Sequence, residues 1–211
     1  MIPGCDALKK LREGNERFTA NVRSIDSLLS YTQRADLATS PQEPIAIILG
    51  CSDSRAPAEL VFDQGLGDLF VIRVAGNIVA PSQVGSVEFA ADRFGTKLVV
   101  VLGHSNCGAI TATLEELQRP TENQSPNLHS IVSRVRPSVQ NMLDSNPDLP
   151  HDELVSKAVR ANVRASCDHL RHGSAILEEL IATNGLLVVG AEYSLETGKV
   201  DFFDGVPAEC E

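Results

Sequence analysis

Short apolar segments rich in β-branched residues recur along this chain, with amphipathic stretches between them. The apolar segments occupy residues 45–50, 68–73, 97–103, 186–193 and 199–204. Strands that alternate with helices form a parallel sheet that helices cover on both faces. Residues 195–198, LETG, form a turn sequence between the last two segments, so we expect that pair to be antiparallel. The pattern predicts an α/β fold with a central, mostly parallel sheet, an antiparallel edge strand and flanking helices.

Helical periodicity accounts for most of the remaining chain. Leu8, Leu11, Phe18 and Val22 fall near one stripe, and leucines 28, 29 and 37 extend it to a break at 40–41. Residues 1–40 are therefore expected to form an N-terminal helical arm. Further helices are expected at 57–62, 84–94, 107–117, 128–143 and 152–182, where Gly173 can divide the last one. A length of 211 residues indicates a single domain over 1–211.

Charge and apolar run length exclude several kinds of partner. The chain carries 18 Lys and Arg against 28 Asp and Glu, a formal net charge of -10, which repels phosphate backbones and anionic headgroups. Its apolar runs are far shorter than the ~20 residues of a membrane span. We therefore expect neither nucleic acid nor a membrane as a partner. The first residues also lack the pattern of a secretory signal, which predicts a cytoplasmic protein.

Metal-binding residues follow two of the expected strands. In open parallel sheets, ligands bind beyond the carboxyl ends of the strands. The first strand leads through Gly50 into Cys51, and the third leads through Gly103 into His104, with Cys107 three residues later. If these strands are neighbours, two thiolates and an imidazole converge, which is a ligand set typical of catalytic zinc. Asp53 could then serve as a fourth ligand or as a hydrogen-bond acceptor beside the metal.

The residues of these loops also allow other interpretations. The two cysteines could be small core residues, and His104 could be a buried histidine with ordinary partners. A cysteine phosphatase needs an arginine six residues after its cysteine, whereas Arg55 follows Cys51 by four. Residues 103–107 lack the final glycine of a nucleophile elbow, and the glycine pair at 65–67 is followed by Phe70 where a dinucleotide loop needs glycine.

The segments CSDSR at 51–55 and HSNCGA at 104–109 resemble the β-class carbonic anhydrases. The similarity extends over about residues 40–115 and includes the closing hairpin near 193–200. This resemblance implies the family's α/β fold, an arm over 1–40 that wraps a partner subunit, and a homodimer that can pair into a homotetramer. It also implies one Zn²⁺ per subunit and reversible hydration of CO2 to bicarbonate and a proton, by attack of zinc-bound hydroxide.

The same resemblance implies roles for individual residues. The zinc ligands would be Cys51, His104 and Cys107, with Asp53 and Arg55 as the catalytic pair. Asp53 would itself bind zinc only in a closed, low-pH form. Bicarbonate would be bound by the side-chain amide of Gln64 and by the backbone of Gly108, near the positive end of a helix.

Departures from the family pattern bear on regulation. Ile48 stands where bicarbonate-inhibited members carry tryptophan, which argues against a second bicarbonate site, although Arg73 and Tyr193 match. The cysteines outside the predicted site, Cys5, Cys167 and Cys210, are interpreted as spare thiols. Two other functions stay open at this point. One is hydrolysis of a CO2-like molecule such as carbonyl sulfide or carbon disulfide, and the other is a non-catalytic zinc or thiol-switch protein.

Overall fold

Five strands form the centre of the molecule. The computed structural model describes residues 1–22, 35, 37–119, 125–145 and 148–210. Its sheet has the order β2-β1-β3-β4-β5. The strands are β1 (Ala46–Gly50), β2 (Leu69–Arg73), β3 (Leu98–His104), β4 (Leu187–Tyr193) and β5 (Val200–Asp204). The first four are parallel and β5 is antiparallel to β4, which confirms the expected α/β class and the edge strand.

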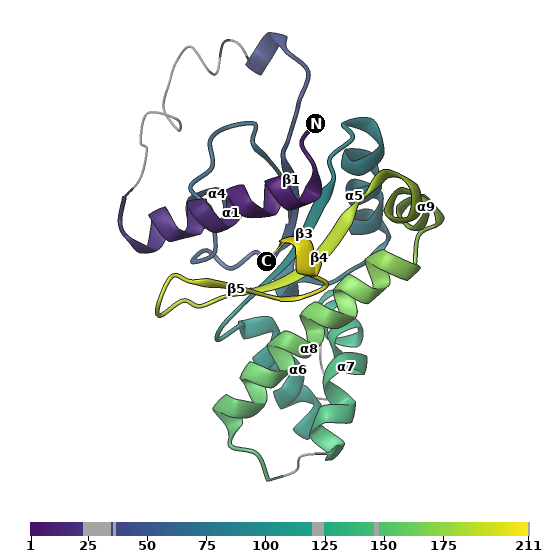
Figure 1. The fold of residues 1–211 in the computed structure, drawn as a ribbon. Helices are drawn as coiled ribbons and strands as arrows, with labels where there is room; N and C mark the ends of the chain where they lie inside the picture. Colours follow the sequence, from purple (N-terminus) through teal and green to yellow (C-terminus); the bar gives the residue numbers. More distant parts are fainter. Residues whose placement is uncertain (23–34, 36, 120–124, 146–147, 211) are drawn as a thin grey trace.

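One face of the sheet is covered by the N-terminal helix α1 (Gly4–Thr19), together with α4 (Ala58–Val61) and the 3₁₀ helix η2 (Ala208–Cys210). Figure 1 shows α1 lying across this face, and Leu8 and Leu11 on it are fully buried. The buried Asn15 side chain ties α1 to its surroundings, because it donates to the carbonyls of Val61 and Gly198 at 3.1 and 2.8 Å. This part of the predicted arm therefore packs on its own sheet.

The remainder of the predicted arm is only partly described. Leu28 and Leu29 lie outside the described residues, within 23–34. That the arm over 1–40 wraps a partner subunit stays a prediction.

The opposite face is covered by α5 (Pro81–Arg93), α8 (His151–His172) and α9 (Ala175–Asn184). Because successive side chains of a strand point to opposite faces, Ile47 and Leu49 pack here while Ile48 packs towards α1. Burial on both faces explains why β1 and β3 are continuous apolar runs. The long predicted helix divides at Gly173, since Ser174 begins a new helix and its hydroxyl accepts from the Leu177 amide at 3.2 Å.

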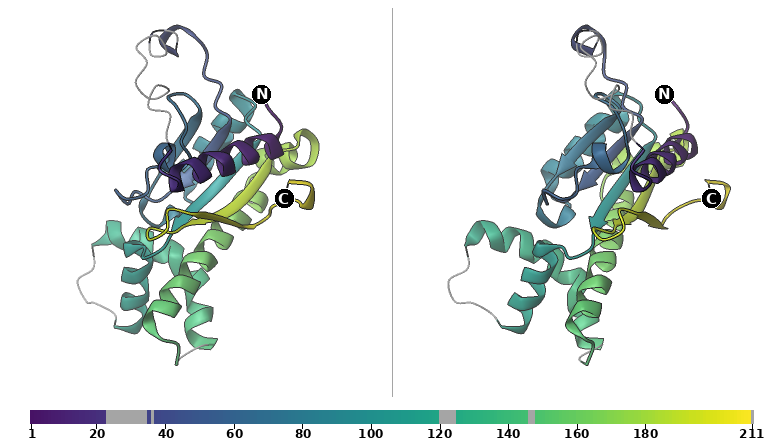
Figure 2. Two further views of the ribbon diagram at one scale, coloured as in Figure 1. Left: turned by 60° about the vertical axis from the view of Figure 1, so that its left-hand side comes forward. Right: turned by 90° about the vertical axis from the view of Figure 1, so that its left-hand side faces the viewer.

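A helical lobe lies beyond the carboxyl ends of the parallel strands. It contains α6 (Gly108–Gln118), α7 (Pro126–Ser145) and the first half of α8, and Figure 2 shows it projecting away from the sheet. Its apolar core includes Cys51 and Cys107, which come from the strand ends. The lobe therefore covers the edge at which the sequence places the metal-binding residues. Within the described residues, no helix has the length and apolar character needed to cross a bilayer.

The two ends of the chain are joined covalently. Cys5 on α1 and Cys210 on η2 form a disulfide across a sequence separation of 205 residues. The Arg12 guanidinium also donates to the Cys210 carbonyl. The interpretation of Cys5 and Cys210 as spare thiols was therefore wrong, because nothing in the local sequence reveals that the chain ends meet. Cys167 is a free, buried thiol, as expected.

Candidate metal centre

Strand pairing brings the predicted ligands together. Cys51 follows β1 directly, His104 is the last residue of β3, and Cys107 is the N-cap residue of α6. Strands β1 and β3 are neighbours, and Gly50 lies opposite Leu102 in their parallel register. The adjacency on which the sequence argument depended is therefore present.

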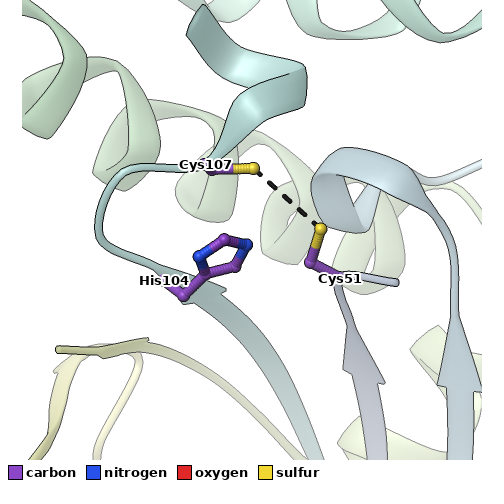
Figure 3. A group of neighbouring side chains, drawn as sticks. All are labelled: Cys51, His104 and Cys107. Atoms are coloured by element: carbon purple, nitrogen blue, oxygen red, sulfur yellow. Dashed lines mark hydrogen bonds between the residues drawn. The ribbon is translucent and has the colours of Figure 1, made fainter. Parts of the chain in front are cut away.

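The three side chains form one compact group (Figure 3). The Cys51 and Cys107 sulfur atoms are 4.0 Å apart, and one candidate ligand atom from each of the three residues lies within 4.8 Å of the others. Exposed fractions of 6% for Cys51, 1% for Cys107 and 1% for His104 show that the group is buried. Their donor set of two sulfurs and one imidazole nitrogen is one that zinc prefers.

The two thiols have opposite proton affinities. The hydrogen bond between Cys107 and Cys51 is the largest influence on both, and it lowers the pKa of Cys51 to about 4 while it raises that of Cys107. The amide of Gly76 also donates to the Cys51 sulfur, at 3.4 Å. These contacts favour the thiolate form of Cys51, and a thiolate is the form of cysteine that binds metals.

The imidazole of His104 is oriented by its neighbours. Its Nδ1 lies 2.9 Å from the Ser105 carbonyl, a contact that favours a proton on Nδ1 and leaves Nε2 as an acceptor. Nε2 is buried without a hydrogen-bond partner among the described residues. A buried ring nitrogen without a partner is unfavourable unless a cation or another polar group meets it. Zinc therefore fits these residues.

Asp53 and Arg55 lie at the open side of the group. The Arg55 side chain donates from Nε to Asp53 Oδ1 at 2.9 Å and from Nη2 to Oδ2 at 2.7 Å, and these bonds hold the pKa of Asp53 well below its usual range. Asp53 Oδ2 lies 3.8 Å from His104 Nε2. An ionised carboxylate is thus held next to the candidate metal position.

Arg73 is a residue whose role here the sequence argument missed. It ends β2 directly opposite Gly50, and it donates from Nε to the Cys51 carbonyl at 2.9 Å and from Nη2 to the Asp53 carbonyl at 2.5 Å. It therefore fixes the backbone of the loop that carries a candidate ligand, Cys51, and the Asp53 carboxylate. Its position at the end of a strand beside β1 was the available signal.

The structure does not bring every predicted residue to this group. Gly108 does lie beside it, as the exposed first residue of α6, with open space where a side chain would be. Gln64 is buried elsewhere and donates to the carbonyls of Phe62 and Asp63 at 2.8 and 3.3 Å. A hollow of about 820 Å³ between α5, α7 and α8 is lined by none of the predicted site residues.

Comparisons with known proteins identify the family to which this chain belongs. Residues 46–200 match the family model described as carbonic anhydrase. Carbonic anhydrase 2 of Mycobacterium tuberculosis is 39% identical over 201 residues, which cover 95% of this chain and 93% of that protein. The carbonic anhydrase of Mycolicibacterium smegmatis is 37% identical, with 92% and 91% covered.

Solved structures show the same fold. A β-carbonic anhydrase of Aspergillus fumigatus superimposes with a TM-score of 0.74 at 25% identity, over 97% of this chain and 93% of that one. One of two tetrameric β-carbonic anhydrases of Sordaria macrospora gives a TM-score of 0.72 at 26% identity, over 81% and 85%.

Proposed function

This chain belongs to the β-class carbonic anhydrases, and on that basis we propose that it catalyses the reversible hydration of CO2 to bicarbonate and a proton at the group formed by Cys51, His104 and Cys107. One observation carries the proposal. Two sulfurs and an imidazole nitrogen converge within 4.8 Å in a buried site, and an arginine-held carboxylate lies beside them.

Zn²⁺, one per subunit, is the cofactor that these three residues would hold. When bound, it supplies a Lewis acid that allows a water molecule to ionise near neutral pH. The protein contributes a buried pocket and a fixed donor set, since His104 is oriented by the Ser105 carbonyl and Cys51 receives the Gly76 amide.

Asp53 and Arg55 would act on the reacting oxygen. The ionised Asp53 carboxylate can accept a hydrogen bond from that oxygen, so that the proton points to Asp53 and a lone pair points to the carbon of CO2. Arg55 keeps the carboxylate ionised and fixes its orientation through two bonds, as a bidentate guanidinium does. Binding of Asp53 to zinc in a closed, low-pH form stays a prediction.

Bicarbonate would meet the amino-terminal end of α6. This helix has 11 residues and begins at Gly108, next to Cys107, so the partial positive charge of its first turn lies beside the ligand group. Gly108 has no side chain to obstruct an anion there. The role of Gln64 in bicarbonate binding stays a prediction, because its amide is engaged by the backbone of residues 62 and 63.

The tetrameric relatives from Sordaria macrospora support a homodimer that pairs into a homotetramer. A cytoplasmic location stays a prediction, and the net charge of -10 supports the expectation that nucleic acid is not a partner.

Metal analysis combined with stopped-flow CO2 hydration tests the proposal. We expect about one zinc per chain, turnover of CO2, loss of turnover on treatment with a chelator, and recovery on addition of Zn²⁺. Rates measured in parallel with carbonyl sulfide and carbon disulfide test the alternative that the protein hydrolyses one of these CO2-like molecules. Zinc-loaded protein that leaves CO2 unchanged would overturn the proposed activity.

A further inference from the structure

Helix α8 carries two buried polar side chains that hold the turn next to Cys51. This turn is the 3₁₀ helix η1 (Ala75–Asn77). The Asn162 amide donates from Nδ2 to the Gly76 carbonyl at 2.8 Å, and the Ser166 hydroxyl donates to the Asn77 carbonyl at 3.1 Å. Asn162 and Ser166 are 2% and 5% exposed. Two buried polar groups on an otherwise apolar helix face indicate a requirement for these particular bonds.

Gly76 connects this helix to the metal centre. Its carbonyl accepts from Asn162 and its amide donates to the Cys51 sulfur at 3.4 Å. Its φ of +71° is a conformation that glycine adopts readily, and an added Cβ would lie 3.2 Å from the Cβ of Ala109. The direction of the Gly76 amide thus depends on a backbone conformation that Asn162 holds from the other side.

An amide bond to a ligating sulfur has a defined chemical effect. Two thiolates would cancel the charge of a zinc ion, which weakens its pull on a bound water relative to a site with neutral ligands. A donor N–H withdraws electron density from the thiolate and so preserves part of that pull. Outer partners of this kind also fix the position of the ligand atom.

We propose that Asn162 is a positioning residue for the metal centre, which holds the Gly76 amide on the Cys51 sulfur and thereby sets the donor strength and position of that ligand. The inference rests on the proposed function only in requiring that Cys51, His104 and Cys107 bind a metal. Ser166 provides a matched control, because it is also a buried α8 side chain but bonds the next residue, Asn77.

The direct test uses ¹¹³Cd²⁺ in place of zinc and detects scalar coupling between the metal and amide protons through N–H···S bonds. We expect a coupling between ¹¹³Cd and the Gly76 amide in the wild type and in Ser166→Ala, and its loss in Asn162→Leu. We also expect a zinc affinity about 10-fold or more lower in Asn162→Leu, measured by chelator competition. Coupling and affinity that are unchanged in Asn162→Leu would overturn the proposal.

A second variant and a second metal keep the test decisive. If Asn162→Leu fails to fold, Asn162→Ala removes the donor without adding bulk. In the Co²⁺ form, loss of the amide bond should move the sulfur-to-cobalt charge-transfer band to longer wavelength, an effect that general destabilisation does not produce. Wild-type protein that binds Cd²⁺ without coupling to Gly76 overturns this inference alone, whereas wild-type protein that binds none of these metals overturns the proposed function as well.

Discussion

Arg55 holds the Asp53 carboxylate with two hydrogen bonds, from Nε to Oδ1 at 2.9 Å and from Nη2 to Oδ2 at 2.7 Å. The exposed guanidinium thereby fixes a carboxylate that has only 16% of its side chain exposed. Asp53 also faces His104, so the Arg55–Asp53 pair lies between solvent and the buried group of Cys51, His104 and Cys107.

Asp53→Asn should retain zinc and lower kcat by about 10²- to 10³-fold, because a neutral amide is a weaker acceptor for the hydrogen bond from the reacting oxygen than the ionised carboxylate is. Arg55→Lys should lower kcat less than Asp53→Asn does, since lysine keeps a positive charge beside Asp53 but cannot form both bonds of the guanidinium. Stopped-flow CO2 hydration with zinc analysis on the same samples measures both. Full turnover in Asp53→Asn would contradict the assignment.

Cys107→Ser should lower zinc affinity by more than about 100-fold, because it removes one of the three proposed ligands. This loss exceeds the one expected when a residue that only hydrogen-bonds a ligand is replaced. The matched control is Cys167→Ala, since Cys167 is equally buried but lies in the core between the sheet and α8. Chelator competition should give wild-type affinity for the control. Equal zinc affinity in the two variants would show that Cys107 is not a ligand.

Substitution of two helical glycines by alanine should change the free energy of unfolding in opposite directions. A Cβ at Gly14 in α1 would overlap the backbone carbonyl of Phe62, whereas one at Gly85 in α5 would meet nothing within 4 Å. Gly14→Ala should lower the free energy of unfolding by about 1–3 kcal/mol, because overpacking against backbone exceeds the gain in helix propensity. Gly85→Ala should raise it by up to about 1 kcal/mol. Urea unfolding at matched protein concentration measures both, and two changes of the same sign would refute this packing.

Removal of the Cys5–Cys210 disulfide should lower the free energy of unfolding by about 2–4 kcal/mol, because the bond restricts the unfolded chain. Cys5→Ser should show this loss and should no longer respond to dithiothreitol. Cys167→Ala should keep the wild-type response to the reductant. If dithiothreitol leaves the free energy of unfolding of the wild type unchanged, Cys5 and Cys210 are not bonded.

Much of this architecture follows from local pattern. Runs such as KLVVVLG are apolar on both faces, which is the property of an interior parallel strand, and such strands present their carboxyl ends at one edge. Cys51 and His104 could therefore be placed at one edge before their distance was known. The division of the last helix at Gly173 and Ser174 follows from the ability of these residues to end and begin helices.

Other features depend on contacts between distant segments. Cys5 and Cys210 meet because α1 and η2 cover the same face of the sheet, and no spacing rule predicts that meeting. Asn162 appears as an ordinary polar residue in an amphipathic helix, and its bond to Gly76 depends on how the lobe docks on the strand ends. The surroundings of Gln64 are likewise set by tertiary packing against α1.

The register between β1 and β3 sets the relative position of Cys51 and His104. Each strand places its predicted ligand, Cys51 or His104, a fixed number of residues past the paired residues Gly50 and Leu102. One residue inserted into either strand would offset Cys51 from His104 by about 3.3 Å, even though every ligand remained in the sequence. Variation in the length of these two strands should thus be as damaging to metal binding as loss of a cysteine.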